Sequence, residues 1–204
     1  MPYIVRPRRL IAIATGALLA FTALPAAAQA ACPVTPTSQP FLQFGDSAYY
    51  SLLSNGHFEA GTTGWTLKNS RVVSGNEPYK LRSSTDSKSL AVDPTGTAAS
   101  PSFCVGLEHQ TFRLFARQTS GTWAQLAINL RFTDASGKLT ESTVYPLAGS
   151  GVGNWVMTPP ITLARNLPLW NADQSMPVQI VLDPVDTGGG WAFDDIYIDP
   201  YKRS

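Results

Sequence analysis

The sequence predicts an all-β domain in which antiparallel strands stack as a sandwich or jelly roll. Three observations lead to this fold class. Apolar and polar residues alternate with a period of two in several segments, and turn-forming residues separate those segments. No segment after residue 40 has a long helical period, and eight prolines between residues 94 and 184 interrupt most helical candidates.

Two consecutive segments, 111–118 and 124–132, show the clearest alternation. In each, every second side chain is apolar and faces the predicted core, as expected of a strand that buries one side. The polar side chains that the alternation places on the opposite side are Arg113, Arg117, Gln125, Asn129 and Arg131. Segments 178–183 and 192–198 repeat the pattern near the C-terminus.

Turn chemistry separates the strands. Asp-Ala-Ser-Gly at 134–137 predicts a hairpin into a polar strand at 139–145, and further turns are expected at 149–154 and 187–190. The pattern predicts about ten to twelve short strands. Strands of this kind in one domain stack as two sheets, so we assign residues 41–204 to a single jelly-roll β-sandwich domain.

Residues 1–30 have the three-part layout of a cleavable secretory signal peptide. Three arginines precede an apolar stretch at 10–24, and small residues follow up to Ala30, after which we expect cleavage. An uncleaved anchor is the alternative, although the apolar stretch is short for a bilayer. Arg8-Arg9 partly matches a twin-arginine signal, so the export route stays open. The signal predicts a secreted, extracellular protein, with the cell surface as a second destination.

Residues 31–40 form a lead-in rich in Pro and Thr, which favours an extended segment. The chain has two cysteines, Cys32 and Cys104, and export would place both in an oxidising environment. We therefore predict a disulfide that closes a loop of about 70 residues, worth roughly 4 kcal/mol in the chain-entropy model. The alternative is a lipidated Cys32, but the residues before it lack the apolar residue expected of a lipobox.

The charge of the chain excludes some partners. Without its leader the chain has 12 basic and 14 acidic residues, a net charge of −2, and no basic patch. This balance argues against a nucleic-acid partner and against a membrane surface as partner once the signal is cleaved. Charged residues make up 14% of the sequence, which is typical of an extracellular β-protein rather than a cytosolic enzyme.

Short motifs at both ends of the domain point to a family. Asn-Gly-His-Phe-Glu occupies 55–59, Gly-Trp follows at 64–65, Ser-Leu-Ala-Val stands at 89–92, and Trp-Ala-Phe-Asp-Asp-Ile-Tyr-Ile-Asp closes the domain at 191–199. Their order resembles the carbohydrate-binding modules of families 4, 9 and 22, within the galactose-binding-like jelly rolls. The resemblance spans about residues 50–199. It implies a jelly-roll fold and a module that binds a glycan or polysaccharide.

The same resemblance implies a structural calcium ion near one end of the sandwich. Its ligands would be Glu59, Asp194 and the loop at 85–88, which contains Asp86. Carboxylates and loop carbonyls are the hard oxygen ligands that calcium takes. The alternative is that Asp194 and Asp195 only accept hydrogen bonds from turns and that Glu59 is solvated.

Five tryptophans are candidates for stacking on a sugar. The resemblance places Trp65 and Trp155 at positions of packed tryptophans, and Trp191 begins the last strand, so we assign all three to packing. Trp123 and Trp170 are the binding candidates, with the polar side chains of the two alternating strands as hydrogen-bonding partners. The alternative is that both tryptophans pack and that the polar side is an ordinary solvated sheet face.

The sequence contains no complete set of catalytic residues of a known type. Gly-Asp-Ser at 45–47 resembles the first block of GDS-type esterases, but those enzymes need a late histidine, and none follows His109. The only other histidine is His57, and no zinc-binding His-Glu-x-x-His pair exists. We therefore expect a secreted, non-catalytic module for a glycan. The alternative is a structural or protein-interaction domain of the cell envelope without a sugar site.

Overall fold

The computed structural model describes Met1 and residues 32–168, 174–185 and 188–200. Residues 2–30 of the expected signal peptide and Trp170 therefore lie outside the described residues. Within the described ranges, no helix is both long enough and apolar enough to span a membrane.

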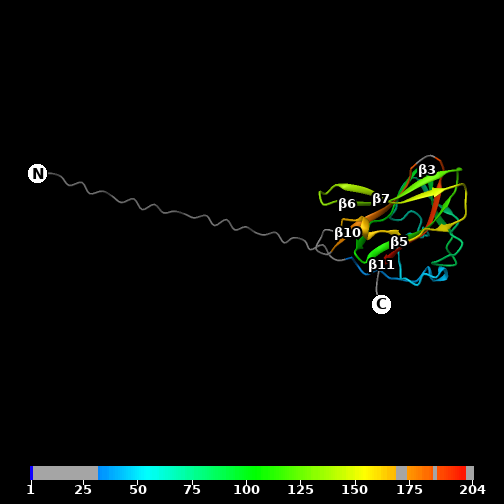
Figure 1. Ribbon diagram of the computed structural model, residues 1–204, viewed down its shortest axis with the longest axis horizontal. Coiled ribbons are helices and arrows are strands. Elements are labelled where there is room, and N and C mark those ends of the chain that lie inside the picture. The colour runs from blue at the N-terminus through cyan, green and yellow to red at the C-terminus, as the bar shows by residue number, and fades with distance from the viewer. Residues whose placement is uncertain (2–31, 169–173, 186–187, 201–204) are drawn as a thin grey trace.

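The domain is built from short strands joined by turns, with two single-turn 3-10 helices (Figure 1). The strands are β1 (Ser51–Leu52), β2 (Thr66–Ser74), β3 (Lys88–Ala99), β4 (Phe103–Gly106), β5 (His109–Gln118), β6 (Ala124–Thr133), β7 (Leu139–Gly149), β8 (Val156–Met157), β9 (Ile161–Thr162), β10 (Ser175–Pro184) and β11 (Trp191–Pro200). The 3-10 helices are η1 (Leu42–Phe44) and η2 (Ala164–Asn166).

The strands form an antiparallel sheet that curls back on itself, in the order β7-β6-β10-β3-β11-β5-β8. The long strand β3 joins the two halves of this sheet. Its C-terminal end pairs with β10, with Ala99 opposite Val181, while its N-terminal part pairs with β11, with Leu90 opposite Phe193. Strands β1, β2, β4 and β9 lie outside this order and pair with β11, β3, β10 and β5 respectively.

One apolar core lies between the two halves. Leu114 of β5 and Leu126, Ile128 and Leu130 of β6 are fully buried in the same cluster, together with Phe193 of β11. The alternation in the sequence therefore identified the inward-facing side chains correctly. The structure confirms the expected fold class, an antiparallel jelly-roll β-sandwich with one disulfide.

A second, smaller cluster covers the outer side of β5 and β11. Phe41 packs edge-on against Tyr50 and Tyr197, with ring centroids 4.8 and 5.5 Å away, and Phe115 of β5 belongs to the same cluster. The chain before β1 supplies Phe41 and Tyr50, and so it shields this side of the sheet from water. Phe115 is the apolar residue that interrupts the polar side of β5.

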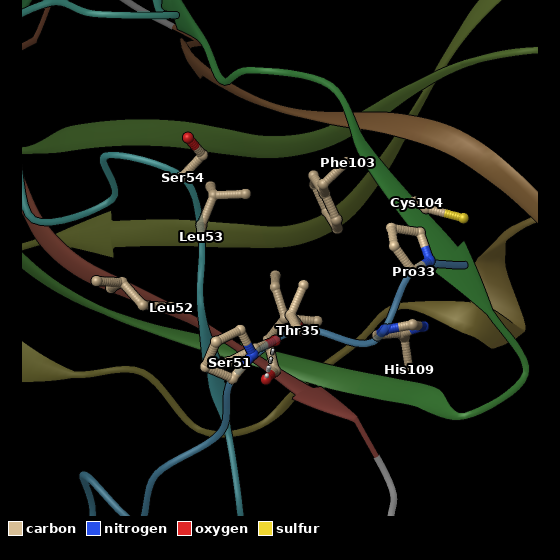
Figure 2. A pocket seen from close by; sticks show the side chains of 11 residues that line it. Pro33, Thr35, Ser51, Leu52, Leu53, Ser54, Phe103, Cys104 and His109 are labelled. Atoms are coloured by element: carbon tan, nitrogen blue, oxygen red, sulfur yellow. Dashed lines mark hydrogen bonds between the residues drawn. The ribbon is translucent and has the colours of Figure 1, made fainter.

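The lead-in runs beside β1 and β4 and leaves a cavity of about 350 Å³ next to them. Figure 2 shows Pro33 and Thr35 of the lead-in facing Leu53 and Phe103 across this space, with His109 at one side. We call it the lead-in cavity. Its lining is mostly apolar.

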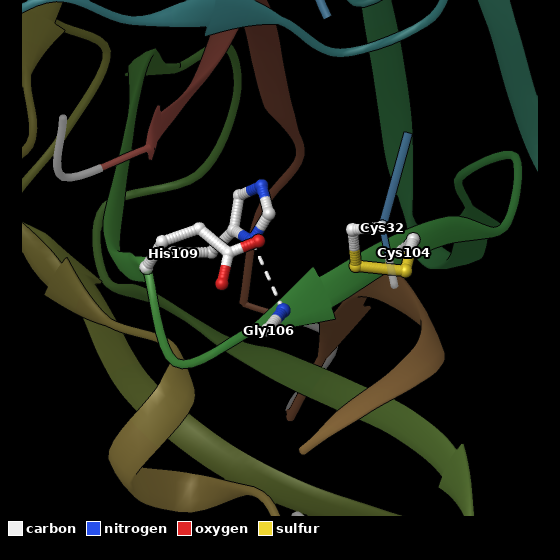
Figure 3. Close-up of a disulfide and its surroundings, with 5 residues drawn as sticks. Cys32, Cys104, Gly106 and His109 are labelled. Atoms are coloured by element: carbon white, nitrogen blue, oxygen red, sulfur yellow. Dashed lines mark hydrogen bonds and ion pairs between the residues drawn. A yellow bond between two sulfur atoms is a disulfide. The ribbon is translucent and has the colours of Figure 1, made fainter. Parts of the chain in front are cut away.

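The predicted disulfide is present. Cys32 is bonded to Cys104 of β4, with 5.3 Å between the two Cα atoms, and Figure 3 shows the bridge beside Gly106 and His109. The bond spans 72 residues of sequence and ties the lead-in to the body of the domain.

Candidate functional site

The polar residues predicted to face one groove lie in different halves of the sheet. Strand β5 pairs with β11, whereas β6 pairs with β7 and β10. Because the apolar sides of β5 and β6 meet in the same core, their polar sides point away from each other. The structure therefore does not bring Arg113 and Arg117 together with the β6 residues.

The two β5 arginines are covered rather than free on a surface. The guanidinium of Arg113 lies 5.6 Å from the ring centre of Phe41, and its Nη1 pairs with Oδ2 of Asp46 at 3.2 Å. The guanidinium of Arg117 lies 5.0 Å from the ring centre of Trp155. These cation–π contacts hold both side chains against the aromatic residues that cover this half.

The β6 residues line the opposite outer face. Nε of Arg131 pairs with Oε1 of Glu141 at 2.6 Å, and Oδ1 of Asn129 accepts a hydrogen bond from Thr143 at 2.7 Å. Gln125 is exposed near the start of the strand. Asn129, which is buried, and Arg131, which is half-buried, are thus both engaged with the neighbouring strand β7.

Trp123 is the most exposed tryptophan that the described part of the chain contains, with 71% of its surface accessible to solvent. It ends the loop between β5 and β6, directly before Ala124, which pairs with Gly149 of β7. Trp65 and Trp191 are buried in the core, as expected, and Trp155 is partly buried under Arg117.

Glycines allow three loops to meet at this end of the sandwich. A Cβ on Gly121 would lie 1.7 Å from the carbonyl oxygen of Gly188, and one on Gly189 would lie 2.0 Å from that of Ser120. Gly121 also has a φ of +82°, which an L side chain rarely adopts. The run of glycines before the last strand is therefore explained by the close approach of two backbones.

Gln118 fixes the third loop. Its buried amide nitrogen donates hydrogen bonds to the carbonyl oxygens of Ser120 and Gly121, and its Oε1 accepts one from the N–H of Gly151 at 3.0 Å. A Cβ on Gly149 would lie 2.0 Å from this oxygen. One buried amide thus connects the loop that carries Trp123 to the loop after β7.

A cleft of about 270 Å³ opens beside these loops, and we call it the edge cleft. Residues 116–118, much of 145–159 and Trp191 line it. Tyr145 and Trp191 supply aromatic surface, while Arg117, Ser150 and Asn154 supply polar groups. Of the predicted binding residues, Arg117 lines the edge cleft. Trp123 is not part of the lining, but the next residue, Ala124, pairs with the lining residue Gly149.

Two residues that line the edge cleft carry buried donors without acceptors. Neither Nε1 of Trp191 nor Nε of Arg117 has a hydrogen-bond partner in the structure. Burying an N–H without an acceptor costs free energy, and both atoms are shielded from the solvent in the cleft. The sequence offered no signal for Tyr145 and Asn154, because only the folded chain brings their segments next to Trp191.

The three residues expected to bind calcium are already engaged with donors. Oε1 of Glu59 accepts hydrogen bonds from the N–H groups of Ser87 and Lys88, both at 2.7 Å. Asp86 forms a buried ion pair with Arg82. Asp194 accepts hydrogen bonds from the backbone of Glu77 and Asp195, at 3.1 and 2.9 Å. These contacts tie Glu59 to the loop at 85–88 and Asp194 to the segment after β2, and calcium binding by Glu59, Asp86 and Asp194 stays a prediction.

Both histidines accept hydrogen bonds from backbone N–H groups. Nδ1 of His57 accepts a hydrogen bond from the N–H of Glu59, and Nδ1 of His109 accepts one from that of Gly106. Among the described residues, Cys32, Glu108 and His109 are the one group of three potential ligands whose atoms lie within 4.8 Å of one another. Since Cys32 is in the disulfide, this group does not offer a thiolate to a metal.

No family model and no curated protein match the sequence. Several solved structures have a similar fold. A xylan-binding domain from CBM 22 is 17% identical with a TM-score of 0.48, and the match covers 78% of this chain and 99% of that chain. The CBM22-1 xylan-binding domain of Paenibacillus barcinonensis Xyn10C is 18% identical with a TM-score of 0.49, covering 72% and 93%.

A third similar structure is TmCBM61, determined in complex with β-1,4-galactotriose. It is 16% identical with a TM-score of 0.42, and the match covers 73% of this chain and 97% of that chain. At these identities the likeness is one of fold alone. The fold class of the chain is the antiparallel jelly roll, and carbohydrate-binding modules are among the proteins that resemble it.

Proposed function

We propose that this protein is a secreted, non-catalytic module that binds a glycan at the edge cleft. The observation that carries the proposal is the edge cleft itself, which combines the aromatic ring of Tyr145 with the polar groups of Arg117 and Asn154. The exposed Trp123 directly precedes Ala124, whose pairing partner Gly149 lines the cleft. Aromatic faces stack on the apolar face of a pyranose, and N–H donors orient its hydroxyl groups. Within the cleft, Tyr145 supplies aromatic surface, and Arg117 and Asn154 supply donors.

The volume of the edge cleft limits the size of the ligand that it can hold. Its volume of about 270 Å³ lies just below the ~300–1,000 Å³ of typical ligand pockets. A single sugar unit at a chain end or branch is the group that suits this space, with the next units extending over Trp123. The lead-in cavity is larger but mostly apolar, so it offers fewer partners to sugar hydroxyls.

The first experiment is a glycan array, together with pull-down by insoluble polysaccharides, using the mature protein. For a glycan that binds, Trp123→Ala should weaken affinity at least tenfold, because it removes the stacking platform. The melting temperature should change little, since an exposed side chain contributes little to the core. Asn154→Ala, in the lining of the cleft, should also weaken binding.

The matched control is Leu139→Ala. Leu139 is exposed like Trp123 but begins β7, at the opposite end of the β6–β7 hairpin from the Ala124–Gly149 pair. Leu139→Ala should leave the affinity for the glycan unchanged. If no glycan binds, or if Trp123→Ala and Leu139→Ala weaken binding equally, the edge cleft is not a sugar site. The cell-envelope interaction domain then becomes the better description.

A further inference from the structure

The lead-in covers the lead-in cavity as a strap that is fastened at two points. At one end is the disulfide between Cys32 and Cys104. At the other end, the backbones of Ser38 and Tyr50 exchange two hydrogen bonds, of 2.9 and 2.8 Å. Between these points, the segment 33–37 forms no backbone–backbone hydrogen bond with the described part of the chain. The disulfide and the Ser38–Tyr50 pair therefore hold this wall of the cavity in place.

The lining of the lead-in cavity is mostly apolar and carries no ionised carboxylate, ammonium or guanidinium. Its apolar members include Leu53, Phe103 and Ile198 from the body of the domain, and Pro33 and Pro36 from the strap. None of the described residues that line it is Asp, Glu, Lys or Arg. Because an ion without a partner is strongly unfavourable in apolar surroundings, the lining suits an uncharged ligand.

His109 gives the cavity one oriented hydrogen-bond donor. Its Nδ1 accepts a hydrogen bond from the N–H of Gly106, so the proton of the neutral ring lies on Nε2. The ring is only 7% exposed, and burial lowers the pKa of His109, which keeps the ring neutral at pH 7. The hydroxyl of Ser51, by contrast, already donates to the carbonyl oxygen of Ile198. The Nε2–H group of His109 is thus the donor that a bound oxygen atom would meet.

The volume and the shape of the cavity indicate the size of its ligand. An apolar cavity of about 150 Å³ holds benzene, and typical ligand pockets measure roughly 300–1,000 Å³. At about 350 Å³, the lead-in cavity has room for one ring with a short substituent. Water suits this space poorly, because each buried molecule needs about two to four polar partners. The rings of Phe103 and Pro33 lie on different walls (Figure 2), and flat faces of this kind pack well against a planar ring.

We propose that the lead-in cavity binds a small, uncharged aromatic molecule of the phenol class, whose oxygen accepts a hydrogen bond from His109. The ring would lie between Phe103 and the strap, and the substituent would extend towards Leu53. This site is separate from the edge cleft, since no residue lines both. The proposal therefore does not depend on glycan binding.

The test uses 4-propylphenol as the probe and the mature, oxidised protein, with affinity measured by calorimetric titration. Nuclear Overhauser effects from the probe to Leu53 and Phe103 should place it in the cavity. The Nε2–H proton resonance of His109 should move downfield with 4-propylphenol, and propylbenzene, which lacks the oxygen, should not cause this shift. 1-Octanol, an alkyl alcohol of similar size, should bind more weakly because it has no flat ring to pack between the walls.

Two variants of the strap form a matched pair. Thr35 lines the cavity, whereas its neighbour Val34 is 81% exposed and is not part of the lining. Thr35→Phe should fill the cavity and weaken the affinity for 4-propylphenol about tenfold or more. Val34→Phe adds the same ring outside the cavity and should leave this affinity unchanged. Reduction of the disulfide should also weaken binding, because it releases one end of the strap.

Four results would overturn the proposal. The first is the absence of saturable binding of 4-propylphenol. The second is a set of Overhauser effects to Tyr145 or Trp191, which would place the probe in the edge cleft. The third is tighter binding of 1-octanol, which would show that the cavity holds an alkyl chain. The fourth is an equal loss of affinity in Thr35→Phe and Val34→Phe. Glycan binding is measured separately, so neither proposal decides the other.

Discussion

His109 shows how a single side chain couples the fold to pH. Its ring is buried at the start of β5, and its unprotonated Nδ1 accepts a hydrogen bond from the N–H of Gly106 at 3.0 Å (Figure 3). Burial lowers the pKa of His109 below its ordinary value of 6.5, although the charge of Glu108 opposes this effect. The folded state therefore prefers the neutral ring.

The lowered pKa predicts a loss of stability in acid. Below pH 6.5 the unfolded chain takes up a proton at this position more readily than the folded protein. Stability should be fully present above pH 6.5 and should fall as the pH drops towards the folded pKa. His109→Asn keeps an acceptor for Gly106 but does not titrate. Urea unfolding of the wild type and the variant from pH 8 to 4.5 should show that the free energy of unfolding falls less in acid for the variant. The same fall with pH in both proteins would contradict this prediction.

The tryptophans show that residue type alone does not determine whether a side chain is buried or exposed. Trp123 and Trp191 are the same residue type, yet one is mostly exposed and the other is only 3% exposed. The polar residues of the strand that follows Trp123 indicated an outward position, and the structure agrees. Nothing local showed that the indole nitrogen of Trp191 would be buried without an acceptor, because its surroundings come from β5 and from the loop after β7.

At the scale of elements, the lead-in has more influence than its composition suggests. The disulfide fixes it to β4, and the following segment places Phe41 over the outer side of β5. Reduction should therefore lower the free energy of unfolding. The loop spans 72 residues, so the chain-entropy model gives about 4 kcal/mol.

This loss can be measured by urea unfolding with and without reductant. The control is the double variant Cys32→Ser with Cys104→Ser, which should unfold like the reduced wild type and should not respond to reductant. Titration of the denatured, unreduced protein should find no free thiol. Equal stability of the oxidised and reduced forms would show that the lead-in adds nothing to the folded state.

At the scale of the whole molecule, one core joins both halves of the curled sheet. Trp65 and Trp191 are buried in this core with side chains of β5, β6, β10 and β11. Neither half can keep its apolar side buried without the other, so the domain should unfold in one transition. Tryptophan fluorescence, which reports the core, and far-UV circular dichroism, which reports the strands, should give the same midpoint. Two separate midpoints would show that the halves unfold independently.

The sequence by itself determined the fold class, the disulfide and the inward-facing sides of the main strands. These follow from local rules: alternation has a fixed period of two, turn residues end strands, and two exported cysteines pair. The hairpin between β6 and β7 is an example, since Asp134 and Gly137 form the expected turn, with Gly137 at a φ of +80°.

Only the tertiary structure decided which outward-facing residues share a surface. Strands β5 and β6 are neighbours in sequence but pair with different partners, so Arg113 and Gln125 lie on opposite outer faces. The edge cleft and the hydrogen bond from the N–H of Glu77 to Asp194 also join segments that are far apart in the chain. Local patterns specify which side of a strand is buried, but strand order depends on packing of the whole core, and strand order determines where polar groups meet.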